Sequence, residues 1–216
     1  EAESCAATFS KYRCTNIVAT WSRGSKGFVY PNNAGYQLDT NAINLYFLET
    51  YYEPFKDLNN AKIFDNSGIR FSYTSSTTAR RPNNAGIITI GIQPIWTHII
   101  APGFRKVTSI GYCSGKSNEH AFPADGITIV GVQMQTHEMG RSIKVRLVRD
   151  GRELPPIAQD HNLDSEYLEY RMVNKGIRVL PGDDLMVECA YDSYDKSKIT
   201  LGGYEAHQEI CQATLV

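Results

Sequence analysis

The chain has 216 residues, a formal net charge of −1 and a hydrophobic fraction of 42%. This hydrophobic fraction is typical of a globular protein, and the near-zero charge with scattered Lys and Arg argues against a nucleic-acid-binding or membrane-surface protein. No apolar run approaches the ~18 residues that a membrane-spanning helix needs. The five histidines allow a metal site, and the five cysteines allow two disulfides with one thiol left over.

Short runs rich in Ile, Val, Thr, Tyr and Phe, separated by Gly, Pro and Asn, indicate a β protein. In chain order they predict strands over residues 15–19, 45–51, 69–74, 87–92, 106–112, 127–137, 142–149, 166–173, 184–191 and 210–215. Ile143, Val145 and Leu147 alternate with Lys144 and Arg146, which indicates one buried and one exposed strand face. Strands at roughly ten-residue spacing predict an all-β, antiparallel β-sandwich of the jelly-roll type.

Ordered motifs from Cys14 to the end of the chain carry a resemblance to a known family. They include Cys14-Thr-Asn-Ile-Val-Ala-Thr-Trp21, Phe28-Val-Tyr-Pro31, Leu48-Glu-Thr-Tyr-Tyr52, Gly111-Tyr-Cys113, Gln135-Thr-His137, Val148-Arg-Asp-Gly-Arg152, Leu180-Pro-Gly-Asp183 and Glu209-Ile-Cys211. On these motifs the chain resembles the copper type II, ascorbate-dependent monooxygenases, and within them the dopamine β-hydroxylase branch. The resemblance implies two jelly-roll domains: the latter part of a first domain over residues 1–91 and a complete second domain over residues 92–216.

The resemblance also implies where copper ligands would stand. In the family, three histidines of the first domain hold an electron-transfer copper, and a His-x-His pair and a methionine of the second domain hold an oxygen-binding copper. Carried over by motif, the third histidine of the first site is Tyr51, the His-x-His pair is Gln135 and His137, and the methionine is Ile210. The adjacent His-His motif of the first site would precede Cys5.

These four positions have mostly lost the chemistry that copper needs. Copper cycling between its two oxidation states favours imidazole nitrogen and thioether sulfur. Gln135 is a poor copper donor, Ile210 has no lone pair, and the Tyr51 phenol would have to lose a proton with a pKa near ~10. The sequence therefore predicts degenerate copper positions, no catalytic residue and no resident cofactor. A rebuilt copper site around His137 and His207 is the alternative.

The remaining histidines and the cysteines are assigned as follows. His98, His120 and His161 are expected on surface loops. The resemblance implies a disulfide between Cys189 and Cys211, whose loop would contribute ~3 kcal/mol on the chain-entropy model. Cys5 and Cys14 form the obvious local pair. Cys113 is then unpaired, either as a buried thiol or as a bridge to another chain.

The leading functional hypothesis is a secreted, catalytically inactive homologue of these monooxygenases that acts by binding a small-molecule or protein ligand. One alternative is a copper- and ascorbate-dependent enzyme that hydroxylates a small amine or peptide through a rebuilt site. Another is a structural protein of an extracellular fluid or matrix. The start at Glu1, without Met, fits a processed secretory protein or a fragment. A partial first sandwich would expose strand edges, so we expect a homo-oligomer or a partner chain, but no nucleic acid and no membrane span.

Overall fold

The computed structural model of the chain describes residues 18–22, 24–38, 46–50, 64, 66–75 and 79–216. Cys5, Cys14 and Tyr51 therefore lie outside the described residues. The strands in chain order are β1 (Ala34–Tyr36), β2 (Asn83–Ala85), β3 (Ile88–Ile92), β4 (Ile99–Ile100), β5 (Val107–Cys113), β6 (Ile127–Gln135), β7 (Gly140–Arg149), β8 (Arg152–Glu153), β9 (Ala158–Asp160), β10 (Arg171–Val179), β11 (Asp184–Tyr191), β12 (Thr200–Leu201) and β13 (Cys211–Leu215). A single helical turn, α2 (Gly115–Asn118), follows β5.

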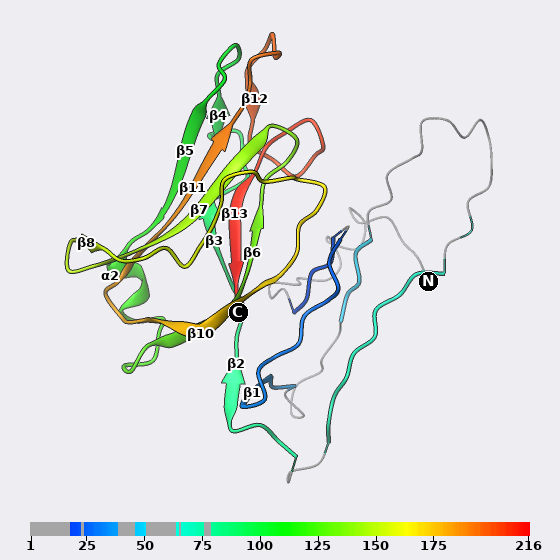
Figure 1. The fold of residues 1–216 in the computed structure, drawn as a ribbon, viewed down its shortest axis with the longest axis vertical. Helices are drawn as coiled ribbons and strands as arrows, with labels where there is room; N and C mark the ends of the chain where they lie inside the picture. Colours follow the sequence, from blue (N-terminus) through cyan, green and yellow to red (C-terminus); the bar gives the residue numbers. More distant parts are fainter. Residues whose placement is uncertain (1–17, 23, 39–45, 51–63, 65, 76–78) are drawn as a thin grey trace.

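Two antiparallel sheets make up most of the described structure (Figure 1). One has the strand order β10-β6-β13-β3, and the other has the order β5-β11-β7-β8, with β9 also paired to β7. The core between them includes Val132 and Leu215 from the first sheet and Val145, Leu185 and Val187 from the second, each at most 1% exposed. The predicted all-β, antiparallel sandwich is confirmed.

Strand β7 shows why the hydrophobic alternation was informative. Ile143, Val145 and Leu147 are all at most 1% exposed, as their spacing predicts. On the opposite face, Lys144 and Arg146 both form ion pairs with Glu153. The buried and exposed faces of β7 therefore follow directly from its period-2 pattern.

Four predicted strands differ from the structure. The described parts of the first two, residues 18–19 and 46–50, form no strand. The described residues 69–74 form no strand, and Ile69, Phe71 and Tyr73 are exposed, because no described strand pairs with this segment. The strand predicted over residues 166–173 is displaced to β10, which continues to Val179. A register shift interrupts β10 between Met172 and Ile177, where Lys175 and Gly176 adopt positive φ values.

The described N-terminal segment lies against the β10-β6-β13-β3 sheet. The Thr20 hydroxyl contacts the side-chain oxygen of Gln133 on β6 at 2.5 Å. The ring of Phe28 packs against Tyr170, with ring centroids 5.1 Å apart. This segment also carries β1, which pairs in parallel with β2 (Figure 1). The outer face of the sheet that holds β6 is therefore partly covered by chain from the first hundred residues.

Strand β3 crosses the expected boundary between residues 91 and 92. It pairs with β13 along its whole length, from Ile88 opposite Leu215 to Ile92 opposite Cys211. Residues just before the expected boundary thus contribute to the sandwich of the second region. The division into domains 1–91 and 92–216 stays a prediction. Within the described ranges, no helix has the length and apolar character needed to cross a membrane.

Candidate functional site

The three predicted ligand positions of the second domain, Gln135, His137 and Ile210, lie at one corner of the sandwich. Strands β6 and β13 are antiparallel neighbours, with Gln135 opposite Gln212. Residues that follow Gln135 and residues that precede Cys211 therefore leave the sheet at the same corner. His137 and Ile210 each stand two positions beyond the Gln135–Gln212 pair, so the structure brings the three positions together in the way that the motifs imply.

His137 is half-buried, and its neighbours on the β13 side hold it in place. Its backbone N–H donates to Glu209 Oε2 at 2.9 Å. Its ring Nδ1 lies 2.8 Å from the carbonyl oxygen of Gln208. Because a carbonyl oxygen can only accept, Nδ1 carries the proton, and in the neutral ring Nε2 keeps a free lone pair. His137 is thus oriented as a ligating histidine would be.

The other two positions do not supply a matching ligand set. Ile210 is 1% exposed, so a buried hydrocarbon stands where a thioether would be needed. Gln135 is half-buried at the end of β6 and offers only a neutral amide. Among the described residues, no group of three or more His, Cys, Asp or Glu side chains could hold a metal ion. One imidazole, one amide and one alkyl group do not fit a copper ion.

Glu209 organises this corner, a role that sequence reasoning missed. Its side chain is almost completely buried, and its carboxylate accepts hydrogen bonds from the backbone of His137 at 2.9 Å and of Met139 at 2.7 Å. Burial raises the pKa of this carboxyl group, and the two backbone hydrogen bonds oppose the shift. Glu209 therefore fixes the β6–β7 turn to the start of β13. Its position inside the Glu-Ile-Cys motif is the signal that could have revealed it.

The β6–β7 turn also depends on close backbone packing at Gly140. A Cβ atom at this position would lie 1.8 Å from the hydroxyl oxygen of Thr136, which is itself buried. No side chain can be accommodated there without moving the turn. The backbone N–H groups that bind Glu209 are therefore presented by a turn whose conformation is tightly specified.

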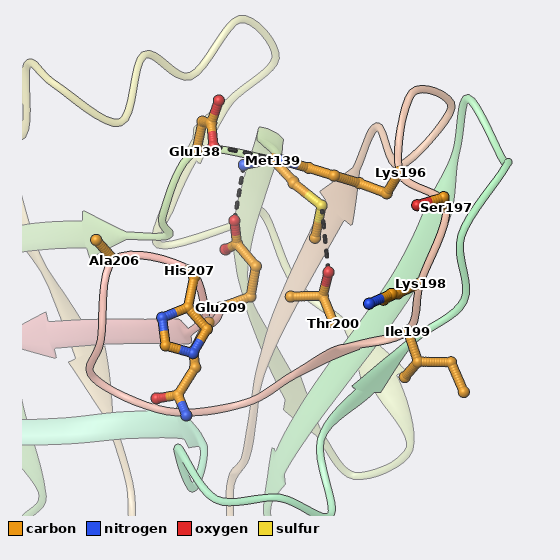
Figure 2. Close-up of a pocket in the computed structure, with 11 residues that line it drawn as sticks. Glu138, Met139, Lys196, Ser197, Lys198, Ile199, Thr200, Ala206, His207 and Glu209 are labelled. Atoms are coloured by element: carbon orange, nitrogen blue, oxygen red, sulfur yellow. Dashed lines mark hydrogen bonds and ion pairs between the residues drawn. The ribbon is translucent and has the colours of Figure 1, made fainter.

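A surface pocket of about 470 Å³ lies beside this corner, between the turn after β6 and the loops on either side of β12 (Figure 2). Met139 and Glu209 form its buried wall, and the Thr200 hydroxyl donates to the Met139 sulfur at 3.8 Å. His207 lines the pocket but is mostly exposed, and its Nδ1 lies 3.4 Å from Glu205. His137 does not line the pocket, so the pocket does not join the two histidines of the alternative copper site.

Two models of one protein family match the chain. The family model described as "copper type II ascorbate-dependent monooxygenase, C-terminal domain" matches residues 83–216, and the model for the N-terminal domain matches residues 1–59. The chain belongs to this family. The C-terminal match covers every strand from β2 to β13, including all three ligand positions of the second region.

Similar proteins cover nearly the whole chain but are much longer. MOXD1 homolog 2 of Drosophila melanogaster is 43% identical over 202 residues, which are 92% of this chain and 26% of that protein. Human dopamine beta-hydroxylase is 35% identical over 201 residues, or 92% of this chain and 31% of the relative. Human DBH-like monooxygenase protein 1 is 32% identical over 207 residues, covering 94% of this chain and 33% of the relative. The chain thus spans a third or less of the length of these relatives.

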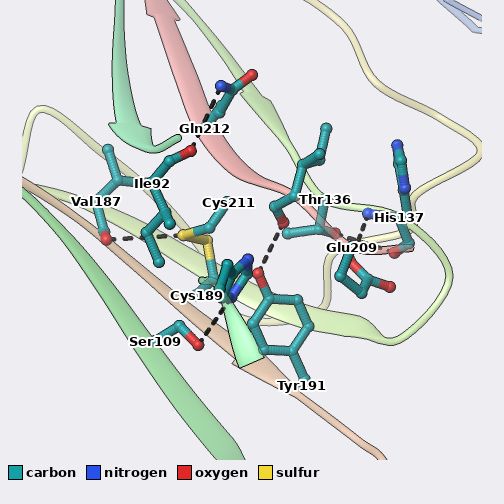
Figure 3. The surroundings of a disulfide bond; sticks show 12 residues. Ile92, Ser109, Thr136, His137, Val187, Cys189, Tyr191, Glu209, Cys211 and Gln212 are labelled. Carbon is teal, nitrogen blue, oxygen red and sulfur yellow. Dashed lines mark hydrogen bonds between the residues drawn. A yellow bond between two sulfur atoms is a disulfide. The ribbon is translucent and has the colours of Figure 1, made fainter. Parts of the chain in front are cut away.

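The disulfide that the resemblance implies is present (Figure 3). Cys189 on β11 is bonded to Cys211 on β13, with a Cα–Cα distance of 5.9 Å, and both residues are fully buried. The two strands belong to opposite sheets, so this bond connects the two layers of the sandwich. Cys113, at the end of β5, is free and half-buried.

One of the three histidines expected on surface loops is buried. His120 and His161 are exposed, but His98 is 5% exposed and lies against the Tyr191 ring with ring centroids 5.8 Å apart. His98 Nε2 lies 3.1 Å from the Ser109 hydroxyl, and burial lowers the pKa of the ring. The surface assignment of His98 was wrong because His98 stands next to β4, whose pairing with β12 was not foreseen.

Proposed function

We propose that this member of the copper type II monooxygenase family does not bind the oxygen-activating copper and acts outside the cell by binding a ligand. The observation that carries the proposal is the side-chain chemistry of the second-region corner. Ile210 places a buried hydrocarbon, and Gln135 an amide, at two of the three ligand positions. A single imidazole from His137 is too little to hold copper against water and competing ligands.

Two further features support the proposal. The bond between Cys189 and Cys211 is of a kind that persists in oxidising compartments, which favours secretion. The pocket of about 470 Å³ beside Glu209 has the size of a small-molecule site and a mixed polar and apolar lining. A small molecule in this pocket, or a protein partner on the surrounding loops, is the expected ligand.

The direct test is copper binding by the purified protein and by a variant with restored ligands. We expect the wild-type chain to show no stoichiometric copper and no ascorbate-dependent oxygen uptake. The double variant Gln135→His/Ile210→Met should bind one copper ion at least ~100-fold more tightly than the wild-type chain, because each added ligand strengthens chelation at an already oriented His137. Copper titrations monitored by a competing chelator measure the difference.

A matched control separates a restored site from a general effect of extra histidine and methionine. Gln159→His/Ile110→Met adds the same residue types at exposed positions on β9 and β5, neither of which lines the pocket, and should leave copper affinity unchanged. Stoichiometric copper in the wild-type chain with submicromolar affinity, or ascorbate-dependent oxygen uptake, would overturn the proposal.

The second candidate function is a copper-dependent hydroxylase with a rebuilt site. The free Nε2 of His137 is the observation in its favour, because the Gln208 carbonyl orients the ring as in a ligating histidine. On this hypothesis, His137→Ala and His207→Ala should each abolish ascorbate-dependent oxygen uptake. If neither substitution changes copper affinity or oxygen uptake, this candidate is excluded.

A further inference from the structure

One end of the sandwich exposes an unusual number of large apolar side chains. They lie on β4 and β12, on the segment between β3 and β4, and on the loops that follow β4 and precede β12. These last two loops project at the top of Figure 1. We call them the apical surface: Trp96, Ile99, Phe104, Tyr194, Ile199 and Leu201. Trp96 is 72% exposed and Ile199 is 60% exposed. Large apolar side chains that are exposed together at one end of a domain mark a candidate interaction surface.

Strand pairing and hydrogen bonds between the loops hold the backbone of the apical surface in place. Ile99 on β4 is the direct partner of Leu201 on β12. The buried Ser193 ties the two long loops together: its hydroxyl donates to the Ala101 carbonyl at 2.6 Å, and its backbone N–H donates to the Phe104 carbonyl at 2.8 Å. The exposure of these side chains is therefore specified by hydrogen bonds between the loops.

The surface of the rest of the sandwich carries mainly charged side chains, with fewer exposed apolar ones. On the outer face of β7 and β11, Lys144, Arg146, Glu153 and Glu188 form a network of ion pairs. The other strands of the two sheets expose fewer large apolar side chains: Ile110 and Tyr112 on β5, and Met172 on β10. The concentration of apolar side chains is thus a property of the β4–β12 end.

The same loops carry more positive than negative charge. The loop that follows β4 and the loop that precedes β12 together carry four cations, Arg105, Lys106, Lys196 and Lys198, and two carboxylates, Asp192 and Asp195. Lys196 pairs with Glu138, and Arg105 lies 4.2 Å over the Tyr194 ring. In the part of the chain that the structure describes, Arg105, Lys106 and Lys198 form no ion pair. The net charge of −1 for the whole chain conceals this local excess.

We propose that the apical surface docks on the surface of an anionic phospholipid bilayer. Amphipathic aromatic rings such as Trp96 and Tyr194 favour the headgroup region, and apolar side chains such as Ile99 and Phe104 gain by leaving water. Lys and Arg on the same loops then meet lipid phosphates and carboxylates. The loop after β4 and the loop before β12 both combine exposed apolar side chains with cations, which fits an anionic bilayer surface. This inference does not depend on the proposed loss of copper.

The test is binding to phosphatidylcholine vesicles with and without phosphatidylserine. The chain has two tryptophans, Trp21 and Trp96. The substitution Trp21→Phe leaves Trp96 as the only tryptophan, so that tryptophan emission reports on the apical surface alone. We expect sedimentation with the phosphatidylserine vesicles and a blue shift of Trp96 emission, both reduced by salt because part of the attraction is electrostatic. Absence of binding to these vesicles overturns the proposal.

Matched variants identify the surface that binds. Ile99→Ser/Phe104→Ser should weaken vesicle binding at least ~10-fold, since two apolar side chains are removed from the interface. Ile110→Ser/Met172→Ser changes two apolar residues of similar exposure elsewhere and should bind as the wild-type chain does. Lys106→Gln/Lys198→Gln should remove most of the preference for phosphatidylserine. Thermal unfolding of each variant shows whether it is folded.

Two results would contradict the proposal even if the wild-type chain binds vesicles. One is an equal loss of binding in the Ile110→Ser/Met172→Ser control. The other is a wild-type dimer in solution that Ile99→Ser/Phe104→Ser converts to a monomer without any change in vesicle binding, which would make a second copy of the chain the occupant of the apical surface.

Discussion

Ile210 and Cys211 are neighbours at the start of β13, but they differ in how the fold uses them. Cys211 forms a bond to Cys189 that connects the two sheets, as the family resemblance implies. Ile210 stands where the family resemblance predicts a methionine ligand, and it contributes a buried hydrocarbon side chain. A cysteine in such a bond is required by the folded structure itself, whereas a metal ligand is required only if the metal is used. The first requirement can therefore outlast the second.

The same comparison extends to the neighbouring residues. Glu209 holds the β6–β7 turn, and the backbone carbonyl of Ile210 accepts a hydrogen bond from the buried Tyr191 hydroxyl at 2.7 Å. His137 keeps the orientation of a ligand without a matching set of partners. Substitution of the structural residues of this corner should therefore lower the free energy of unfolding, and the expected loss differs from residue to residue.

The largest effect is expected for the disulfide. Cys189→Ala/Cys211→Ala should lower the free energy of unfolding by about 3 kcal/mol, because the bond closes a loop of 22 residues that is otherwise free in the unfolded chain. Chemical denaturation of the two proteins measures the difference. Cys113→Ala, which removes a free thiol, is the control and should change stability much less. Equal losses in the two experiments would mean that burial of the sulfur atoms matters and the bond does not.

A smaller effect is expected for the buried carboxylate. Glu209→Gln should lower the free energy of unfolding by about 2 kcal/mol, because an amide NH₂ group would face one of the two backbone donors that the carboxylate now satisfies. Glu205→Gln, four residues earlier on an exposed part of the same loop, should have little effect. A variant as stable as the wild-type chain would show that Glu209 does not hold the turn.

The effect of Glu209→Gln should also depend on pH. Burial raises the pKa of Glu209 above its usual value of 4.5. A carboxyl group whose pKa is raised on folding contributes stability that is fully present below the unfolded pKa and is lost as the pH rises through the folded pKa. The stability difference between wild type and variant should therefore shrink as the pH rises above about 4.5. A stability difference that grows as the pH rises would show that folding lowers the pKa of Glu209 and does not raise it.

Much of the fold could be predicted from the sequence because local patterns determine it. The alternation of Ile143, Val145 and Leu147 follows from strand geometry, and their burial confirms it. The course of β10 could not be predicted, because its register shift at Lys175 and Gly176 depends on pairing with β6. The exposed alternation of Ile69, Phe71 and Tyr73 is a strand pattern that lacks a paired neighbour within the described structure.

The candidate site was predictable only where motifs carry it. The positions of Gln135, His137 and Ile210 follow from the family resemblance, and antiparallel pairing of β6 with β13 brings them to one corner. The two backbone hydrogen bonds of Glu209 and the burial of His98 depend on loops that meet only in the folded chain. No local pattern reports a contact between residues 98 and 191.

The smallest effect is expected at Tyr191, and it tests the backbone of Ile210 apart from its side chain. Tyr191→Phe removes the hydroxyl that donates to the Ile210 carbonyl and leaves the ring in the core. The loss should be about 1 kcal/mol, because one buried carbonyl loses its partner while the apolar packing is kept. Tyr204→Phe, at a largely exposed ring, is the matched control and should be neutral. If Tyr191→Phe is neutral as well, the start of β13 is held by the disulfide and by Glu209, and the Ile210 backbone adds nothing to the structural role of this corner.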